Sequence, residues 1–423
     1  MPVRGLPVRP HLDQLRRQAR ELLRAHRDGD ADAATAFAEF HPDPPPGDEA
    51  KLADAQLVLA RSYQASSWPR LVQAVSLVAA IWDDDLDAVR RLVTATPRLR
   101  DEHVLIRTDS HWGPPMSDAA NLGRDRIIRW LHEQGATDHG RAIDRAALQG
   151  KVETVHLLYD LAGRPPVPDD ALDGAAYTLN LGGTTAMLAL GARVIDDHGN
   201  RLAPVAVVLE TDSREPEAKH GILALYEQHG LAYPDTAPMA LHRGRIDLLE
   251  AHLARDHGVL HRTWRHREIY PAEMGCREPI DATVGTPLDG TTLLHMAIEF
   301  DEMAIARWLI AHGADVNARA HVGRSGFGGY TPLFTSVISM PNFWMNYRNR
   351  GPLAAPYTEL LLEHGADVNI RASIWKRLHP GHGDSARHEY RDVTALSWGR
   401  QFHAPVFVSE PALRLIEAAG GIP

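Results

Sequence analysis

The sequence predicts an all-α fold, in which a small helical cap region precedes a row of about nine helical hairpins stacked as a solenoid. Three observations predict it. The spacing between the start of one helix and the glycine that ends the next is 21 residues both from Thr292 to Gly313 and from Pro114 to Gly135. Apolar residues recur at intervals of three and four within each unit, which is typical of amphipathic helices. Turn pairs such as Asp289-Gly290 separate the units.

The composition excludes several classes of protein. With 423 residues, 44% hydrophobic and 24% charged, the chain is in the range of folded proteins. Its net charge of -10 disfavours nucleic acid and anionic membranes, so we expect neither as a partner. Cys276 is the single cysteine, which excludes an internal disulfide and favours a reducing, cytoplasmic location. No segment is typical of a signal peptide or a membrane span.

The sequence pattern over the first 76 residues predicts the helical cap region. Amphipathic helices are expected over residues 11–27, 31–40 and 49–63, and the proline-rich residues 42–47 form a rigid linker between the second and the third. The role of this region would be to cover the apolar end of the row of hairpins.

Residues 77–423 predict the repeat array. Its clearest units begin near residues 289, 329 and 392, and degenerate units precede them. The regular spacing is interrupted by insertions near residues 257–288, 338–352 and 370–391. Insertions in repeat proteins fall in loops, which are often where function lies.

The unit that begins at Asp289 resembles the ankyrin repeat, whose signature is Gly-x-Thr-Pro-Leu-His-x-Ala followed by Leu-Leu-x-x-Gly-Ala-Asp-x-Asn. Thr292, Leu294, His295 and Ala297 match, while Leu293 replaces the proline. The resemblance implies a scaffold that binds a protein partner on its concave face and turn loops. It also implies that His295 makes hydrogen bonds between repeats. With its helical leader, the chain is similar to bacterial ankyrin-repeat proteins.

An alternative function is an enzyme or a small-molecule-binding protein. Its pocket would be formed by the central degenerate repeats and the loop over residues 257–276, where ionisable groups are concentrated. His266, Glu268 and Glu273 would supply acid–base chemistry if folding brings them within hydrogen-bond reach. This hypothesis predicts an enclosed pocket lined by these three side chains. The same segment also supplies candidate ligand-binding residues, which are Trp264, Tyr270 and Arg277.

Two histidine groups have spacings that a metal ion could use. His257 and His261 are four residues apart and would share a helical face, and a second group lies between His379 and Glu389. Solvated histidines explain the first group better, and a mobile polar loop explains the second, because glycine and proline give it no fixed geometry. We therefore expect no metal site and no cofactor.

Aromatic residues gather in the insertion near residues 338–352. Phe343, Trp344 and Tyr347 have the composition of an interface hot spot, and we regard them as candidate ligand-binding residues. An insertion of this length could equally fold back and bury its own aromatic rings on the solenoid.

Overall fold

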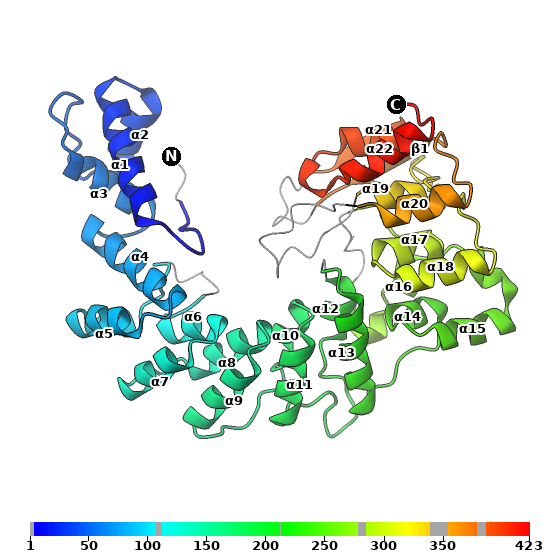
Figure 1. Ribbon diagram of the computed structural model, residues 1–423, viewed down its shortest axis with the longest axis horizontal. Helices are drawn as coiled ribbons and strands as arrows, with labels where there is room; N and C mark the ends of the chain where they lie inside the picture. Colours follow the sequence, from blue (N-terminus) through cyan, green and yellow to red (C-terminus); the bar gives the residue numbers. More distant parts are fainter. Residues whose placement is uncertain (1–3, 107–111, 212, 278–284, 339–353, 379–385) are drawn as a thin grey trace. The chain divides into compact units, whose positions relative to one another are not determined.

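The computed structural model describes residues 4–106, 112–211, 213–277, 285–338, 354–378 and 386–423. Over these residues the chain is mostly helical, and the helices follow one another as antiparallel pairs (Figure 1). The all-α prediction is confirmed, with one addition. Residues of the third insertion form a two-stranded antiparallel sheet, β1 (Ala372–Lys376) and β2 (His388–Val393).

The chain divides into two compact units, each of which is described by itself. Unit 1 comprises Met1–Pro168 and Thr185–Gly191, and unit 2 comprises Asp169–Thr184 and Ala192–Pro423. The predicted boundary between a cap region and an array at residue 76 stays a prediction. The first helices of the chain are α1 (Leu12–Arg27), α2 (Ala31–Phe40), α3 (Leu52–Ser62), α4 (Trp68–Trp82), α5 (Leu86–Ala95), the 3-10 helix η1 (Pro97–Arg100), α6 (Pro115–Leu122), α7 (Asp125–Glu133), α8 (His139–Leu148) and α9 (Val152–Leu161).

The helices that follow are α10 (Asp173–Tyr177), α11 (Leu181–Ala189), α12 (Val205–Glu210), α13 (Pro216–Gln228), α14 (Ala237–His242), α15 (Ile246–Arg255), η2 (His257–Leu260), α16 (His266–Ile269), η3 (Ala272–Met274), α17 (Leu293–Glu299), α18 (Met303–Ala311), α19 (Pro332–Val337), α20 (Pro356–Glu363), α21 (Ala395–Gln401), η5 (Pro405–Phe407) and α22 (Glu410–Ala418).

Three N-terminal helices form a small core of their own in unit 1. Phe37 of α2 and Val58 of α3 are buried in it, and Leu22 of α1 packs against them. The third helix begins three residues later than predicted. Its start is fixed by Asp54, whose carboxylate accepts a hydrogen bond from the backbone amide of Lys51 at 2.7 Å. After these helices, α4, α6 and α8 pack successively on one another, as the first helices of stacked hairpins do.

Unit 2 repeats the same packing in its C-terminal part, where α14, α17, α19 and α21 contact one another in that order. The predicted core positions Leu294, Ala297, Ile305 and Leu309 are all buried. Gly313 has a φ of +96°, as a glycine that ends a helix in a left-handed turn requires. The spacing from Thr292 to Gly313 thus corresponds to one helical hairpin, α17 and α18.

Side chains of the repeat motif connect each hairpin of unit 2 to the next. His295 is fully buried, and its Nε2 lies 3.2 Å from the carbonyl oxygen of Tyr330 in the following repeat. This contact agrees with the hydrogen bonding between repeats that the ankyrin resemblance implies for His295. Asn317 donates from its amide to the carbonyl of Gly365 at 3.0 Å and accepts from the amide of Asp367 at 2.8 Å. Asn369 repeats this arrangement with Gly420 and Ile422, at 3.2 and 2.9 Å.

The hairpin of β1 and β2 corrects the expectation of a polar loop without fixed geometry. Residues 379–385 lie outside the described residues, but the segments on both sides are paired strands. Packing explains why these strands form, because every second residue of β1 is buried, namely Ala372, Ile374 and Lys376. On β2, the ring of Tyr390 meets that of Trp398 edge to face at 4.8 Å. The strand pattern here is too short for a sequence reading to separate it from a loop.

Candidate functional site

The segment that the sequence singled out, residues 257–277, is a chain of short helical turns. Trp264 is buried, and its backbone amide donates a hydrogen bond of 2.8 Å to the carbonyl of Thr291 in the next repeat. The guanidinium of Arg262 lies over the indole of Trp264, 4.1 Å from its centroid. Trp264 therefore holds this loop in place against the following repeat.

The three residues proposed for acid–base chemistry have other surroundings. The carboxylate of Glu268 accepts from the amide of Arg265 at 2.8 Å and pairs with Arg262, so it caps the short helix α16. The amide of His266 donates to Asp289 at 2.8 Å, and its ring centroid lies 4.9 Å from that of Tyr270. Glu273 is exposed on η3. These positions favour structural roles, and the catalytic assignment stays an untested prediction.

The candidate ligand-binding residues are divided between the core and the surface. Tyr270 is buried, and its ring faces His242 at a centroid distance of 5.8 Å. Arg277 is exposed, and its backbone amide donates to Glu210 at 3.2 Å. The remaining three, Phe343, Trp344 and Tyr347, lie outside the described residues.

The histidine groups do not assemble into a metal site in the described part of the chain. His257 and His261 are both exposed. They do not share a helical face, because α15 ends at Arg255 and the 3-10 helix η2 follows it. Residues 379–385 of the second group lie outside the described ranges. Elsewhere in those ranges, no three side chains of His, Cys, Asp or Glu are placed to bind one ion. Cys276 is buried, and burial raises the pKa of its thiol to about 12.

The turn loops of unit 2 form a continuous backbone ladder that we call the finger row. It comprises residues 262–266, 288–292, 319–330, 371–376 and 386–393. The amide of Gly290 donates to the carbonyl of Trp264 at 2.7 Å, and the amide of His321 donates to the carbonyl of Gly290 at 2.7 Å. Further along, the amide of Gly328 donates to the carbonyl of Ser373 at 2.7 Å. Loops from successive hairpins are thereby fixed to one another.

Arginine dominates the exposed charge of the finger row. Its exposed carboxylates are those of Asp289, Glu389 and Asp392. Seven arginines are exposed, and they are Arg262, Arg265, Arg319, Arg324, Arg371, Arg387 and Arg391. Because the whole chain has a net charge of -10, this surface has the opposite sign to the rest of the protein. The sequence did not predict this positive surface. A signal was present, because six of the seven arginines lie in the predicted insertions or next to a glycine of a turn.

A second feature of unit 2 is a group of charged side chains buried between α13, α14 and α17. Arg214 and Glu299 form an ion pair of 2.9 Å, with only 6% and 1% of their side chains exposed. Arg214 also donates from Nε to the carbonyl of Glu299 at 2.6 Å and from Nη1 to that of Thr211 at 2.9 Å. The guanidinium is thus surrounded by acceptors, which is what a buried charge requires.

Beside this pair, Lys219 and His242 share a hydrogen bond of 2.8 Å between Nζ and Nδ1. Nε2 of His242 is 2.9 Å from the carbonyl of Ile269, so Nε2 is the protonated nitrogen and Nδ1 the acceptor. Burial lowers the pKa of Lys219 to about 7 and holds the pKa of His242 well below its usual value. Nζ of Lys219 also lies 4.2 Å from the ring centroid of Phe300.

A cavity of about 790 Å³ opens next to these buried groups. Glu302 is buried in its wall and lies 2.7 Å from Nε2 of His220. Asp301 accepts a hydrogen bond of 2.9 Å from the hydroxyl of Tyr357. Apolar side chains complete the lining, among them Ile305. The lining of the cavity therefore combines acidic and apolar side chains.

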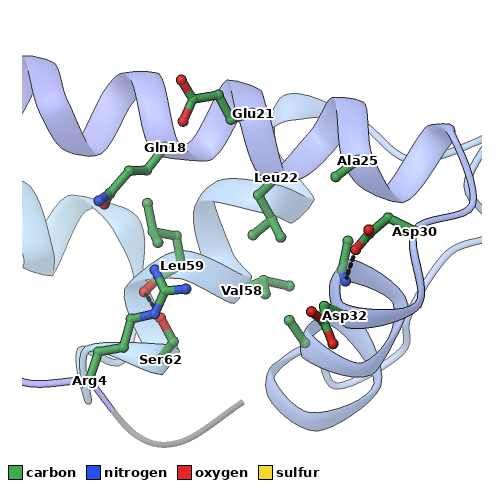
Figure 2. Close-up of a pocket in the computed structure, with 12 residues that line it drawn as sticks. Arg4, Gln18, Glu21, Leu22, Ala25, Asp30, Asp32, Val58, Leu59 and Ser62 are labelled. Carbon is green, nitrogen blue, oxygen red and sulfur yellow. Dashed lines mark hydrogen bonds between the residues drawn. The ribbon is translucent and has the colours of Figure 1, made fainter.

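Unit 1 has a smaller cavity, of about 360 Å³, between its first three helices (Figure 2). Leu22, Val58 and Leu59 lie in its interior, while Glu21 and Asp32 lie at its edge (Figure 2). It borders the core of the N-terminal helices.

No described helix combines the length and the apolar character needed to cross a membrane. A family model described as the ankyrin repeat matches residues 289–321. Among solved structures, the human ASB11 ankyrin repeat domain is 17% identical with a TM-score of 0.24, covering 73% of this chain and 99% of that one. The ankyrin repeat domain of Bcl-3, a member of the IkappaB protein family, is 16% identical with a TM-score of 0.20, covering 81% and 97%. A comparison with curated proteins found no match.

Proposed function

Because the chain contains an ankyrin repeat at residues 289–321, a fold that serves protein–protein interaction, we propose that it is a scaffold whose finger row binds a protein partner. The ladder of backbone hydrogen bonds from Trp264 to Ser373 carries this proposal. A surface that is ordered before binding loses less conformational entropy when a partner docks. The reducing, cytoplasmic location that we propose is supported by the unpaired, buried Cys276.

The binding surface that we propose is the finger row together with the adjoining part of the concave side of the hairpins. Partner contacts would begin at the turns, where exposed side chains such as Val322 project from loops fixed by the ladder. Val322 is 53% exposed, so an isolated apolar group is available there for contact.

A photo-crosslinking experiment tests the scaffold function. A benzophenone amino acid is placed at Val322 in the full chain, and a matched control places it at Val406, which is 60% exposed on η5 outside the finger row. We expect the native host to yield a discrete crosslinked protein from position 322 and not from position 406. The captured protein, once purified, should co-elute with the unmodified chain in size-exclusion chromatography. Equal capture at both positions, or failure to co-elute, would contradict the proposal.

The second candidate function is binding of a small molecule in the cavity of unit 2. Its volume of about 790 Å³ is in the range of small-molecule sites. Its lining contains five acidic residues, Glu215, Glu217, Glu299, Asp301 and Glu302, against Arg214 and His220, so an organic cation with an apolar body fits best. This pocket differs from the one hypothesised from sequence, because His266, Glu268 and Glu273 are not among its lining residues.

Ligand-observed NMR with benzamidine tests this second candidate. Benzamide, which has the same ring without the positive charge, is the matched control ligand. We expect saturation transfer to benzamidine alone, and we expect Glu217→Gln to weaken it because the variant removes an exposed carboxylate at the cavity without disturbing the core. Equal signals from both ligands would contradict a cation site.

A further inference from the structure

We infer that the partner of the finger row presents an acidic protein segment, whose carboxylates are bound by Arg387 and Arg391. The inference rests on the proposed function and names the chemistry of the partner. It starts from the hairpin of β1 and β2, which is an addition to the regular repeat and brings two arginines beside the preceding turn.

Aromatic rings hold both guanidinium groups in position. The guanidinium carbon of Arg387 lies 4.8 Å from the ring centroid of Trp375 and 5.4 Å from that of Phe327. That of Arg391 lies 4.4 Å from the centroid of Phe327. Stacking on a ring restricts a long, flexible side chain while its edge N–H groups still point outward. The two arginines are therefore oriented before any ligand arrives.

Among the residues that the structure describes, one carboxylate, that of Glu389, pairs with both of these cations. Glu389 is 2.9 Å from Arg387 and 2.8 Å from Arg391, so three charged groups leave one net positive charge. Each guanidinium has five N–H donors, and Glu389 engages one nitrogen of each in the described contacts. Both side chains are exposed, which leaves donors for a carboxylate from outside.

Further arginines extend this positive surface along the ladder. Arg371 donates to the carbonyl of Asp392 at 2.6 Å, and Arg319 donates to the carbonyl of Arg371 at 2.7 Å. Because backbone carbonyls accept these hydrogen bonds, they fix both side chains without neutralising the charge of Arg319, while Arg371 also pairs with the exposed carboxylate of Asp392 at 3.5 Å. Several cations in a row fit an extended segment with carboxylates at intervals better than they fit one isolated anion.

Carboxylates within the surface favour an acidic protein over a nucleic acid. Asp289, Glu389 and Asp392 are exposed among the arginines and would repel a continuous line of phosphates. A peptide can place its acidic side chains opposite the arginines and neutral ones opposite the carboxylates. Such alternation is the electrostatic complementarity that gives an interface its specificity.

Fluorescence anisotropy with the full chain tests the inference. The probe is a fluorescein-labelled peptide of alternating Glu and Ala residues, and the same peptide with Gln in place of Glu controls for shape. We expect the Glu peptide to bind more tightly at low salt and to weaken as salt is added. Each of Arg387→Ala and Arg391→Ala should weaken it by about tenfold, which corresponds to a charged hydrogen bond.

Two control measurements keep the outcomes distinct. Arg164→Ala and Arg193→Ala remove exposed, ion-paired arginines outside the finger row, and they should leave peptide binding unchanged. Thermal unfolding of each variant establishes that the fold is intact. Equal binding of the Gln peptide, unchanged binding after both finger-row substitutions, or tighter binding of single-stranded DNA would overturn the inference. If crosslinking at Val322 then still succeeds, the scaffold function stands and only the acidic partner is wrong.

Discussion

The buried ion pair of Arg214 and Glu299 gives the sharpest stability prediction. Replacing Arg214 with Met removes a guanidinium that is 94% buried at its side chain and leaves the Glu299 carboxylate, 99% buried, without its cation. Breaking a buried pair in this way costs about 3–5 kcal/mol of unfolding free energy. The lost hydrogen bonds to backbone carbonyls act in the same direction.

The expected effect is therefore a loss of about 4 kcal/mol, concentrated in unit 2. Because a chain with two compact units need not unfold in one step, hydrogen exchange followed by mass spectrometry is the suitable assay. Peptides from α13 and α17 should lose protection, while those from α1–α3 should not change. Arg193→Met, which removes an exposed arginine paired with Asp169, is the matched control and should cost less than about 1 kcal/mol.

A double variant separates the charge from the packing. Arg214→Met combined with Glu299→Met removes both charges and fills the space with apolar atoms, so it should recover most of the loss. The reasoning would be refuted if Arg214→Met behaved like Arg193→Met. It would also be refuted if the double variant were as unstable as the two single variants added together.

The remaining predictions concern single buried groups. Burial raises the pKa of Asp118 from 3.8 to about 7, so the folded chain keeps a proton that the unfolded chain loses, and the unfolding free energy should fall as pH rises from about 4 to about 7. Asp118→Asn should flatten that profile in thermal unfolding across pH, and parallel profiles of variant and parent would contradict the assignment. His295→Ala should cost about 2–3 kcal/mol, because it leaves a cavity and the carbonyl of Tyr330 unpaired. Burial lowers the pKa of His295 from 6.5 to about 4, so between these pH values the unfolded parent binds a proton that the folded parent does not, and the loss, measured by urea unfolding, should be smaller at mildly acidic pH than at neutral pH. Cys276, buried and with its pKa raised to about 12, should react with Ellman's reagent at least about tenfold more slowly in the folded chain than in urea, and equal rates would show that the thiol is accessible.

The fold was largely predictable because its strongest signals are local. The pattern from Thr292 to Gly313 combines helix starts, apolar periodicity and a terminating glycine, and each of these acts within a few residues. The three N-terminal helices were predicted for the same reason. The hairpin of β1 and β2 was not, because its stability comes from Tyr390 packing on Trp398 in the following helix.

The candidate surfaces were less predictable, because they depend on contacts between distant residues. Arg214 and Glu299 are 85 residues apart, and nothing near either of them in the sequence indicates that they meet. The loop over residues 257–276 attracted attention through its many ionisable groups. Its carboxylate Glu268 caps a helix, a use that composition cannot separate from chemistry. Phe327 likewise becomes informative only when Arg391 is seen above its ring.

The amide bridges of Asn317 and Asn369 have a consequence for how this protein can change. Each bridge fixes the pitch from one hairpin to the next through backbone groups at the helix ends, away from the loop tips. The loop between Asn369 and Thr394 has accommodated a whole strand pair while Asn369 still reaches Gly420. A change in the length of the loop between Asn369 and Thr394 should therefore leave the stacking of the neighbouring hairpins preserved, so new recognition elements can be added to this loop without altering the repeat frame.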